Sequence, residues 1–174
     1  MDTLSRLPTW RQMNLDTTPE AEVSYDASFY FDPNGASTGF NYNDEVALFV
    51  GLDQPGRRIF SVGYESNGAG SGAIRGWFLR GGEVASTESY EISNAPHKIE
   101  VAWQSNASGG FSLYVDDQLL ETIYGDTSAY QVDEVRLGPS TVPAGASGTM
   151  FFDQFDSNRV NGVEYKLIMP AAFS

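Results

Sequence analysis

The chain has 174 residues and no cysteine, which excludes a disulfide framework, a thiolate zinc site and a cysteine nucleophile. Its 23 acidic and 10 basic residues give a formal charge of -13 at pH 7, which argues against partners that need Lys and Arg clusters, namely nucleic acid and anionic membranes. A well-solvated acidic surface explains this charge, and cation binding is the alternative.

We predict one domain over residues 1–160, because a chain of this length with 41% hydrophobic residues can bury one sizeable core. Residues 1–22 form a poorly patterned N-terminal arm, in which Pro8 disfavours a helix. Residues 161–174 form a C-terminal tail, within which 163–168 is either an edge strand or part of a linker. The sequence has no internal repeat, heptad pattern or long helical pattern.

Short segments of β-strand character, separated by turn residues, follow one another along the chain. In the first, Val23–Phe31, apolar and polar side chains alternate, and Asp32-Pro33-Asn34-Gly35 then makes a turn because proline presets φ. Glu45–Leu52 is apolar at almost every position, which predicts a central strand covered on both faces. The other predicted strands are Arg58–Tyr64, Ala73–Leu79, Glu83–Ile92, Ile99–Gln104, Phe111–Val115, Leu119–Ile123, Gln131–Leu137 and Thr149–Asp156.

The segment His97–Ile123 is predicted to be a β-meander of three strands. Apolar and polar residues alternate along it, so each strand has one apolar face. The loop SNASGG and the tight turn Asp116-Asp117 reverse the chain. The rest of the chain must cover the apolar face, so the predicted fold is an all-β, two-sheet antiparallel β-sandwich.

This meander also carries a family resemblance. HKIEVAW, a polar loop and FSLYVDDQLLETI are similar to the central hairpins of laminin-G-like, concanavalin A-like jelly rolls, with Asp117 where glycine is usual. Two further segments also resemble these domains, FYFDPNG (29–35) and residues 132–159, so the resemblance covers residues 23–159. It implies a concanavalin A-like jelly roll of a bacterial surface or secreted protein. This fold hosts lectins, glycosidases, lyases and adhesion modules, so the resemblance implies no single function.

The residues do not predict an active site. Laminarinase-like enzymes of this fold carry their carboxylates on one strand as Glu-x-Asp-x-x-Glu, and no predicted strand has that spacing. Asp153 and Asp156 are three residues apart, so they point to opposite faces of a strand unless a bulge intervenes. His97 is the only histidine, and we predict that it bonds a neighbouring loop. The sequence lacks a nucleophile elbow, so we expect no catalytic residues and no enzyme.

A metal site is predicted around the last strand. In TMFFDQFD, strand alternation places Asp153 on the same face as Phe151 and Phe155. Met150 and Phe152 occupy the other face, so either face could be the inner one. If the face of Asp153 is inside, the carboxylate needs an arginine, backbone N–H groups or a cation, because an unpaired buried charge is very costly. Many jelly rolls of this kind bind a structural calcium, which the resemblance therefore implies as one alternative. Asp32 and Asn34 would supply further oxygen ligands if the first and last strands pair.

Aromatic side chains with nearby polar groups predict a platform for a sugar ring. The residues that we select for ligand binding are Trp77, Arg75, Tyr64, Tyr42 and Phe40. The alternative is that Trp77 is a core aromatic, as we expect for Trp103, because large aromatic residues mostly build sandwich cores.

We therefore predict a non-catalytic extracellular recognition module, with carbohydrate as the ligand class on the strength of the resemblance. The alternative is a structural or adhesive module that binds surface-protein partners or forms homo-oligomers through its edge strands. A glycan-cleaving enzyme is the third interpretation. The first residues have no apolar signal sequence and no apolar run is long enough to span a membrane. An extracellular location thus implies that the chain is a piece of a longer protein.

Overall fold

The protein is described by a computed structural model that covers residues 13–16, 21–39, 44–54, 56–66, 70–159 and 165–167. Side chains are described for all of these except 13–16, 159 and 165–167. The described residues form strands, turns and loops without a helix, and none of them belongs to a helix that could cross a membrane. The strands are β1 (Met13–Asp16), β2 (Ser24–Asp32), β3 (Glu45–Leu52), β4 (Arg58–Glu65), β5 (Ser71–Arg80), β6 (Glu83–Ser86), β7 (Tyr90–Ser93), β8 (His97–Gln104), β9 (Gly109–Val115), β10 (Gln118–Gly125), β11 (Glu134–Thr141), β12 (Phe151–Arg159) and β13 (Tyr165–Leu167).

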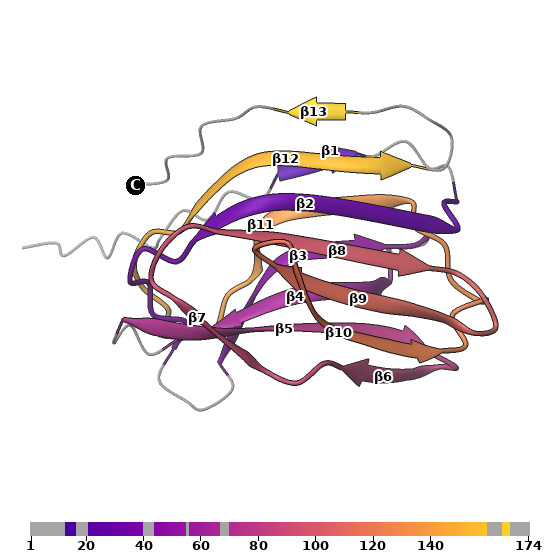
Figure 1. Cartoon of the computed structure of the whole chain (residues 1–174), viewed down its shortest axis with the longest axis horizontal. Helices are drawn as coiled ribbons and strands as arrows, with labels where there is room; N and C mark the ends of the chain where they lie inside the picture. Colours follow the sequence, from indigo (N-terminus) through magenta and orange to yellow (C-terminus); the bar gives the residue numbers. More distant parts are fainter. Residues whose placement is uncertain are drawn as a thin grey trace, which may run out of the picture.

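The strands form two antiparallel sheets stacked one on the other (Figure 1). The seven-stranded sheet has the order β1-β11-β3-β4-β5-β6, and β7 also pairs with β5. The six-stranded sheet has the order β10-β9-β8-β2-β12-β13. The prediction of an all-β, two-sheet antiparallel sandwich is therefore confirmed. In the C-terminal tail, β13 is an edge strand that pairs with β12.

One predicted strand, Glu83–Ile92, is in fact two. Between β6 and β7 the chain turns Thr87 into the sandwich, where its hydroxyl accepts a hydrogen bond from the Gly76 N–H at 3.0 Å. The Thr87 N–H donates in turn to the Gly76 carbonyl at 2.8 Å. This local pairing satisfies a buried hydroxyl and interrupts the ladder, which sequence alternation alone did not indicate.

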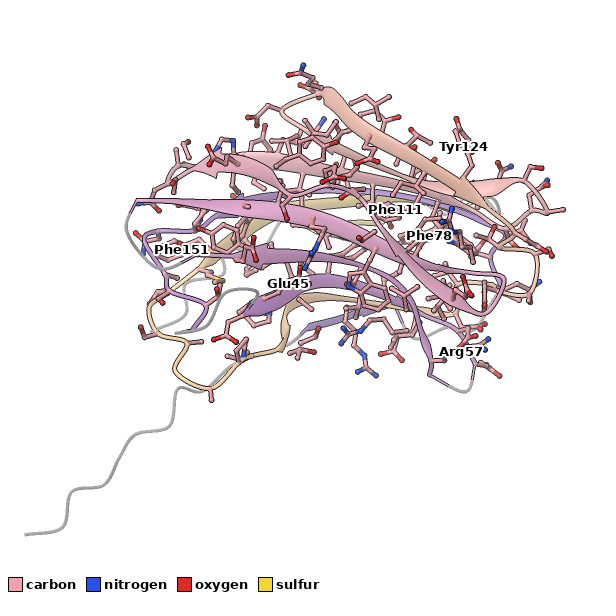
Figure 2. The ribbon with its side chains drawn as sticks, turned by 90° about the horizontal axis from the view of Figure 1, so that it is seen from below. Glu45, Arg57, Phe78, Phe111, Tyr124 and Phe151 are labelled. Atoms are coloured by element: carbon pink, nitrogen blue, oxygen red, sulfur yellow. The ribbon has the colours of Figure 1, made fainter. Side chains whose placement is uncertain are left out.

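Aromatic side chains fill the space between the sheets. Phe78 and Phe111 come from opposite sheets and stack with ring centroids 6.1 Å apart (Figure 2). Phe60 lies 6.0 Å from both Phe111 and Trp103. Trp103 is buried, as predicted. Because each strand presents every second side chain to this layer, its other side chains are free to build the two outer faces.

The outer face of the seven-stranded sheet is partly apolar. Every residue of β3 except Glu45 is buried, which confirms the prediction of a strand covered on both faces. Ala47, Val50 and Leu52 form a small buried cluster separate from the main core. This sheet therefore uses part of its outer face for packing.

A β-bulge in β12 corrects the prediction for Asp153. Gln154 has a φ of 49°, and the register against β2 shifts between Asp153 and Asp156. The bulge lets both Phe152 and Phe155 enter the core. Asp153 is consequently exposed, and Asp156 lies on the same outer face instead of the opposite one.

The reason for expecting a cation at Asp153 is therefore absent. Its carboxylate accepts the Gln154 N–H at 2.7 Å. Asp32 accepts the Asn34 N–H at 2.9 Å, and the Asn34 amide donates to the Thr149 carbonyl at 3.3 Å. Within the described residues, no group of three or more acidic or histidine side chains is arranged to hold a metal ion.

Candidate functional site

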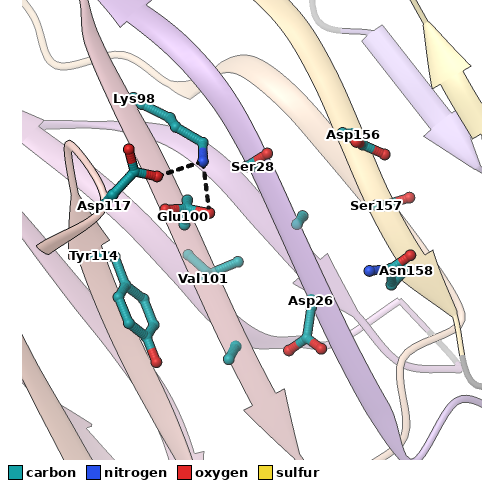
Figure 3. A pocket seen from close by; sticks show the side chains of 12 residues that line it. Asp26, Ser28, Lys98, Glu100, Val101, Tyr114, Asp117, Asp156, Ser157 and Asn158 are labelled. Carbon is teal, nitrogen blue, oxygen red and sulfur yellow. Dashed lines mark hydrogen bonds and ion pairs between the residues drawn. The ribbon is translucent and has the colours of Figure 1, made fainter. Parts of the chain in front are cut away.

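A groove of about 550 Å³ is hollowed into the outer face of the six-stranded sheet (Figure 3). It crosses β9, β8, β2 and β12 and ends at the β9–β10 turn. Most of its lining side chains are the alternate ones that point away from the core. These are Asp26, Ser28, Lys98, Glu100, Ala102, Tyr114, Asp117, Asp156 and Asn158.

The first row of lining side chains runs straight across the sheet. Tyr114 on β9 lies opposite Glu100 on β8. Glu100 lies opposite Ser28 on β2, which lies opposite Asp156 on β12. Adjacent strands are about 4.8 Å apart, so this row spans roughly 14 Å from the aromatic ring to the last carboxylate.

A second row lies beside the first. Ala102 on β8 is opposite Asp26 on β2, and Asp26 is opposite Asn158 on β12. Ala102 and Ser28 have the shortest side chains of the outward-facing lining residues. The surface is therefore lowest over β8 and β2, and it is bordered by longer side chains from β9 and β12.

Lys98 is the single cation among the described residues that line the groove, and it is already paired. Its Nζ lies 2.7 Å from Asp117 Oδ1 and 3.0 Å from Glu100 Oε1. The hydrogen bonds that the ammonium group donates, first to Asp117 and then to Glu100, raise the pKa of Lys98. The ammonium group stays charged and is tied to one border of the groove.

Asp26 and Asp156 differ from the paired acids. Neither carboxylate has a hydrogen-bond or ion-pair partner among the residues described for this chain. The Asp26 side chain is solvent-accessible, yet desolvation raises the pKa of its carboxyl group. Both facts fit its position, because a group on the floor of a concave surface meets water on one side and is surrounded by protein on the others.

This groove offers a definite set of contacts to a ligand. Asp26 and Asp156 present unoccupied acceptors, and the Asn158 amide can both donate and accept. Tyr114 adds an aromatic ring with a hydroxyl group. Four carboxylates against one ammonium group make the surface negative, so an anionic ligand is disfavoured.

Part of the platform predicted from the sequence is wrong. Tyr64 is 1% exposed and packs in the core against Phe31, with ring centroids 5.1 Å apart. Tyr64 occupies an inward-facing position of β4, so no ligand can reach its ring. Phe40 and Tyr42 lie outside the residues that the structure describes.

Trp77 and Arg75 do share one surface, the outer face of the seven-stranded sheet. The Arg58 guanidinium carbon lies 5.3 Å from the centroid of the Trp77 ring, as a cation–π contact. The Arg75 guanidinium pairs with Glu45 at 2.9 Å. Both predicted ligand contacts are therefore occupied by neighbouring side chains.

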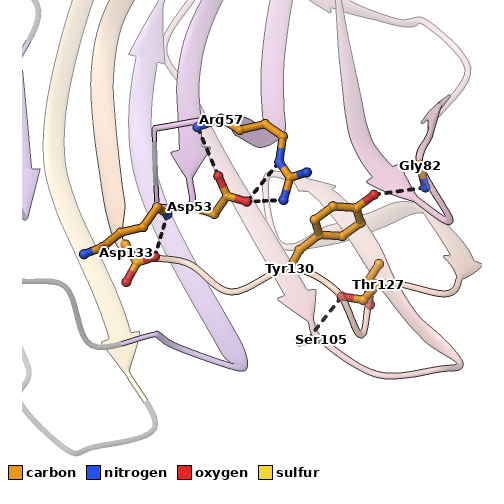
Figure 4. A network of polar contacts seen from close by, with 8 residues as sticks. Asp53, Arg57, Gly82, Ser105, Thr127, Tyr130 and Asp133 are labelled. Atoms are coloured by element: carbon orange, nitrogen blue, oxygen red, sulfur yellow. Dashed lines mark hydrogen bonds and ion pairs between the residues drawn. The ribbon is translucent and has the colours of Figure 1, made fainter.

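A second polar cluster lies at one end of the sandwich and is structural (Figure 4). Arg57 donates to the Asp53 carboxylate from Nε at 3.0 Å and from Nη2 at 2.5 Å, and its guanidinium lies over the Tyr130 ring. The Tyr130 hydroxyl accepts the Gly82 N–H at 3.0 Å. Asp133 accepts a backbone N–H from the β3–β4 turn at 2.8 Å. Because these polar groups satisfy one another, the cluster ties loops together.

No protein-family model matches the sequence, and no curated protein sequence is similar to it. Solved structures are similar in three dimensions. An alginate lyase from Pseudomonas aeruginosa matches with a TM-score of 0.57 and 12% identity, over 90% of this chain and 77% of the lyase. The fold is a concanavalin A-like jelly roll.

Two further structures share this jelly roll. A SAP-like pentraxin from Limulus polyphemus matches with a TM-score of 0.58 and 10% identity, over 87% of this chain and 70% of the pentraxin. An endo-β-1,4-glucuronan lyase from Trichoderma reesei matches with a TM-score of 0.56 and 11% identity, over 87% of this chain and 74% of the lyase. These identities establish the jelly-roll fold alone, because one fold hosts many functions.

Proposed function

We propose that this jelly roll is an extracellular glycan-recognition module and that the groove of the six-stranded sheet is its binding surface, which holds a glycan without cleaving it. The observation that carries the proposal is the lining of this groove. Asp26, Asp156 and Asn158 present polar groups free for sugar hydroxyls, and Tyr114 presents a ring on the same surface. The structural likeness to lyases of alginate and glucuronan makes carbohydrate the first ligand class to test.

The charge of the groove limits the class of glycan that it can bind. Lys98 is engaged by Glu100 and Asp117, so a uronate carboxylate would meet no free cation among the described lining residues. It would instead face Asp26 and Asp156. We therefore propose that the module takes neutral or amino-bearing glycans and rejects polyuronates.

A glycan array that contains neutral, amino-sugar and uronic acid glycans tests this function. We expect binding to the first two classes only, with Tyr114→Ala lowering the affinity about tenfold, or about 1.4 kcal/mol. Tyr124→Ala is the matched control, because Tyr124 is an exposed tyrosine of the same sheet that does not line the groove. Binding to no glycan class would overturn the proposal and leave a protein-binding adhesive module as the alternative.

One observation favours a second function, glycoside hydrolysis. Asp26 and Asp156 occupy diagonal positions on neighbouring strands, where residues are about 7–8 Å apart and their Cβ atoms somewhat closer. Inverting glycosidases hold their two carboxyl groups roughly 6.5–9.5 Å apart, and one of them has a raised pKa. Desolvation raises the pKa of Asp26. Release of reducing ends by the wild type that Asp26→Asn abolishes would establish a hydrolase, whereas binding without release supports recognition alone.

A further inference from the structure

Three side chains meet in a chain of hydrogen bonds at one end of the sandwich. Ser93 ends β7, His97 begins β8, and Asp116 lies in the β9–β10 turn. Ser93 Oγ lies 2.9 Å from His97 Nε2, and His97 Nδ1 lies 2.7 Å from Asp116 Oδ2. The prediction that His97 bonds a neighbouring loop is thereby confirmed. The order of atoms is that of a Ser–His–Asp triad, which is recognised by geometry and not by position in the sequence.

The hydrogen bonds assign the tautomer of the imidazole. Burial of the Asp116 carboxyl acts in the opposite direction, but hydrogen bonds from His97 and from the Lys98 N–H lower its pKa. An ionised carboxylate can only accept, so Nδ1 carries the proton. In the neutral imidazole, Nε2 then has a free lone pair, to which the Ser93 hydroxyl can donate. This is the protonation state that a general base needs before it activates a serine.

The turn that supplies Asp116 holds both of its residues in the left-handed region. Asp116 has a φ of 52° and Asp117 a φ of 64°, and aspartate is one of the few residues other than glycine that adopt this region readily. The conformation lets Asp116 Oδ1 accept the Lys98 N–H at 2.9 Å while Oδ2 accepts from His97. The turn therefore fixes the orientation of the Asp116 carboxylate toward the imidazole.

Ser93 is accessible to a substrate, whereas the histidine behind it is enclosed. Ser93 is exposed, and the His97 side chain is 14% exposed. The next residue along the chain, Asn94, accepts the Gly35 N–H through Oδ1 at 2.5 Å. This bond turns the Asn94 side chain toward the β2–β3 connection and ties the residue that follows Ser93 in place.

We propose that Ser93, His97 and Asp116 form an acyl-transfer site that hydrolyses short-chain esters. Ser93 Oγ adds to the ester carbonyl while its proton passes to His97 Nε2. The tetrahedral intermediate expels the alcohol, which takes that proton, and an acyl-serine remains. Water then adds to the acyl carbon as His97 accepts its proton, and the carboxylic acid leaves as the proton returns to Ser93. Asp116 is a positioning residue, because it orients the imidazole without touching the ester.

This site does not require a glycan in the groove, so the two proposals can fail separately. It lies close to that surface, since the neighbours of His97 and Asp116 along the chain, Lys98 and Asp117, both line the groove.

The purified chain, assayed with p-nitrophenyl acetate and with a fluorophosphonate probe, tests the proposal. We expect the wild type to turn over the ester and the probe to attach at Ser93, located by peptide mass spectrometry. Ser93→Ala and His97→Gln should each lower the rate about 10²–10⁴-fold, the usual contribution of acid–base catalysis. Asp116→Asn should lower it as well, because an amide can reverse the tautomer while keeping a hydrogen bond.

Ser108→Ala is the control for non-specific acylation, because Ser108 is an exposed serine in the β8–β9 turn. It should leave both the rate and the labelling unchanged. Circular dichroism of each variant separates loss of activity from loss of fold. A wild-type rate equal to that of Ser93→Ala, with no label on Ser93 in a folded chain, would overturn the proposal.

Discussion

The two outer faces of the sandwich follow the same alternation but present different chemistry. On the seven-stranded sheet, Arg75 pairs with Glu45, Arg58 lies over Trp77, and part of β3 is buried. On the six-stranded sheet, short side chains leave a groove, and two carboxylates in it have no partner among the described residues. Residue type alone therefore does not make a recognition surface. A surface can bind a ligand when its outward groups are not already bound to one another.

Filling the groove should have the largest effect. Ala102→Trp places a large side chain at the lowest point of the six-stranded face, so glycan binding should fall below detection by calorimetry. Ala73→Trp is the control, because Ala73 is a partly exposed alanine of the seven-stranded sheet. If both variants bind equally well, the groove is not the binding surface.

Two serines, one on each outer face, allow the two faces to be compared by thermal stability. Ser61, on the outer side of β4, is fully buried, and its hydroxyl has no hydrogen-bond partner among the described residues. Removing an unsatisfied buried hydroxyl should stabilise the fold, so Ser61→Ala should raise the free energy of unfolding by about 1 kcal/mol. The expected rise in Tm is about 2–4 °C. Ser28→Ala in the groove should leave Tm unchanged and weaken glycan binding; a lower Tm for Ser61→Ala would show that its hydroxyl is satisfied in solution.

The smallest expected effect concerns pH. Burial raises the pKa of Asp26 above 3.8 in the folded state, so the folded protein binds this proton more tightly than the unfolded chain. The contribution of Asp26 to the free energy of unfolding therefore falls as pH rises from 3.8 through the raised pKa of the folded state. At neutral pH the ionised Asp26 carboxylate destabilises the folded state. Asp26→Asn should be slightly more stable than the wild type at pH 7, with the difference vanishing below pH 3.8 in thermal unfolding scans. A difference that grows toward acid pH would contradict the assignment.

The strands and the sandwich could be predicted because apolar and polar residues alternate within the sequence of each strand, independently of the other strands. Ile99, Val101 and Trp103 enter the core as their parity requires. The predictions that failed depend on interactions between distant strands. The bulge at Gln154 brings Phe155 into the core although Asp153 is exposed, and it also brings Asp156 onto the face of Asp26.

The groove itself could not be predicted from the sequence. Asp26, Glu100 and Tyr114 each occupy an outward position in a predicted strand, so that signal was present. Their proximity depends on the strand order β9-β8-β2-β12, in which β2 is inserted between strands remote in sequence. The Ser93–His97–Asp116 chain has the same origin, since it joins both sheets.

The most direct test of the groove as a glycan-binding surface is amide chemical-shift mapping by NMR during titration with a glycan that the array identifies. The account predicts that the amides of Asp26, Ser28, Ala102 and Tyr114 shift together, while those of Ser61, Arg75 and Trp77 stay in place. Shifts confined to the seven-stranded face would contradict it.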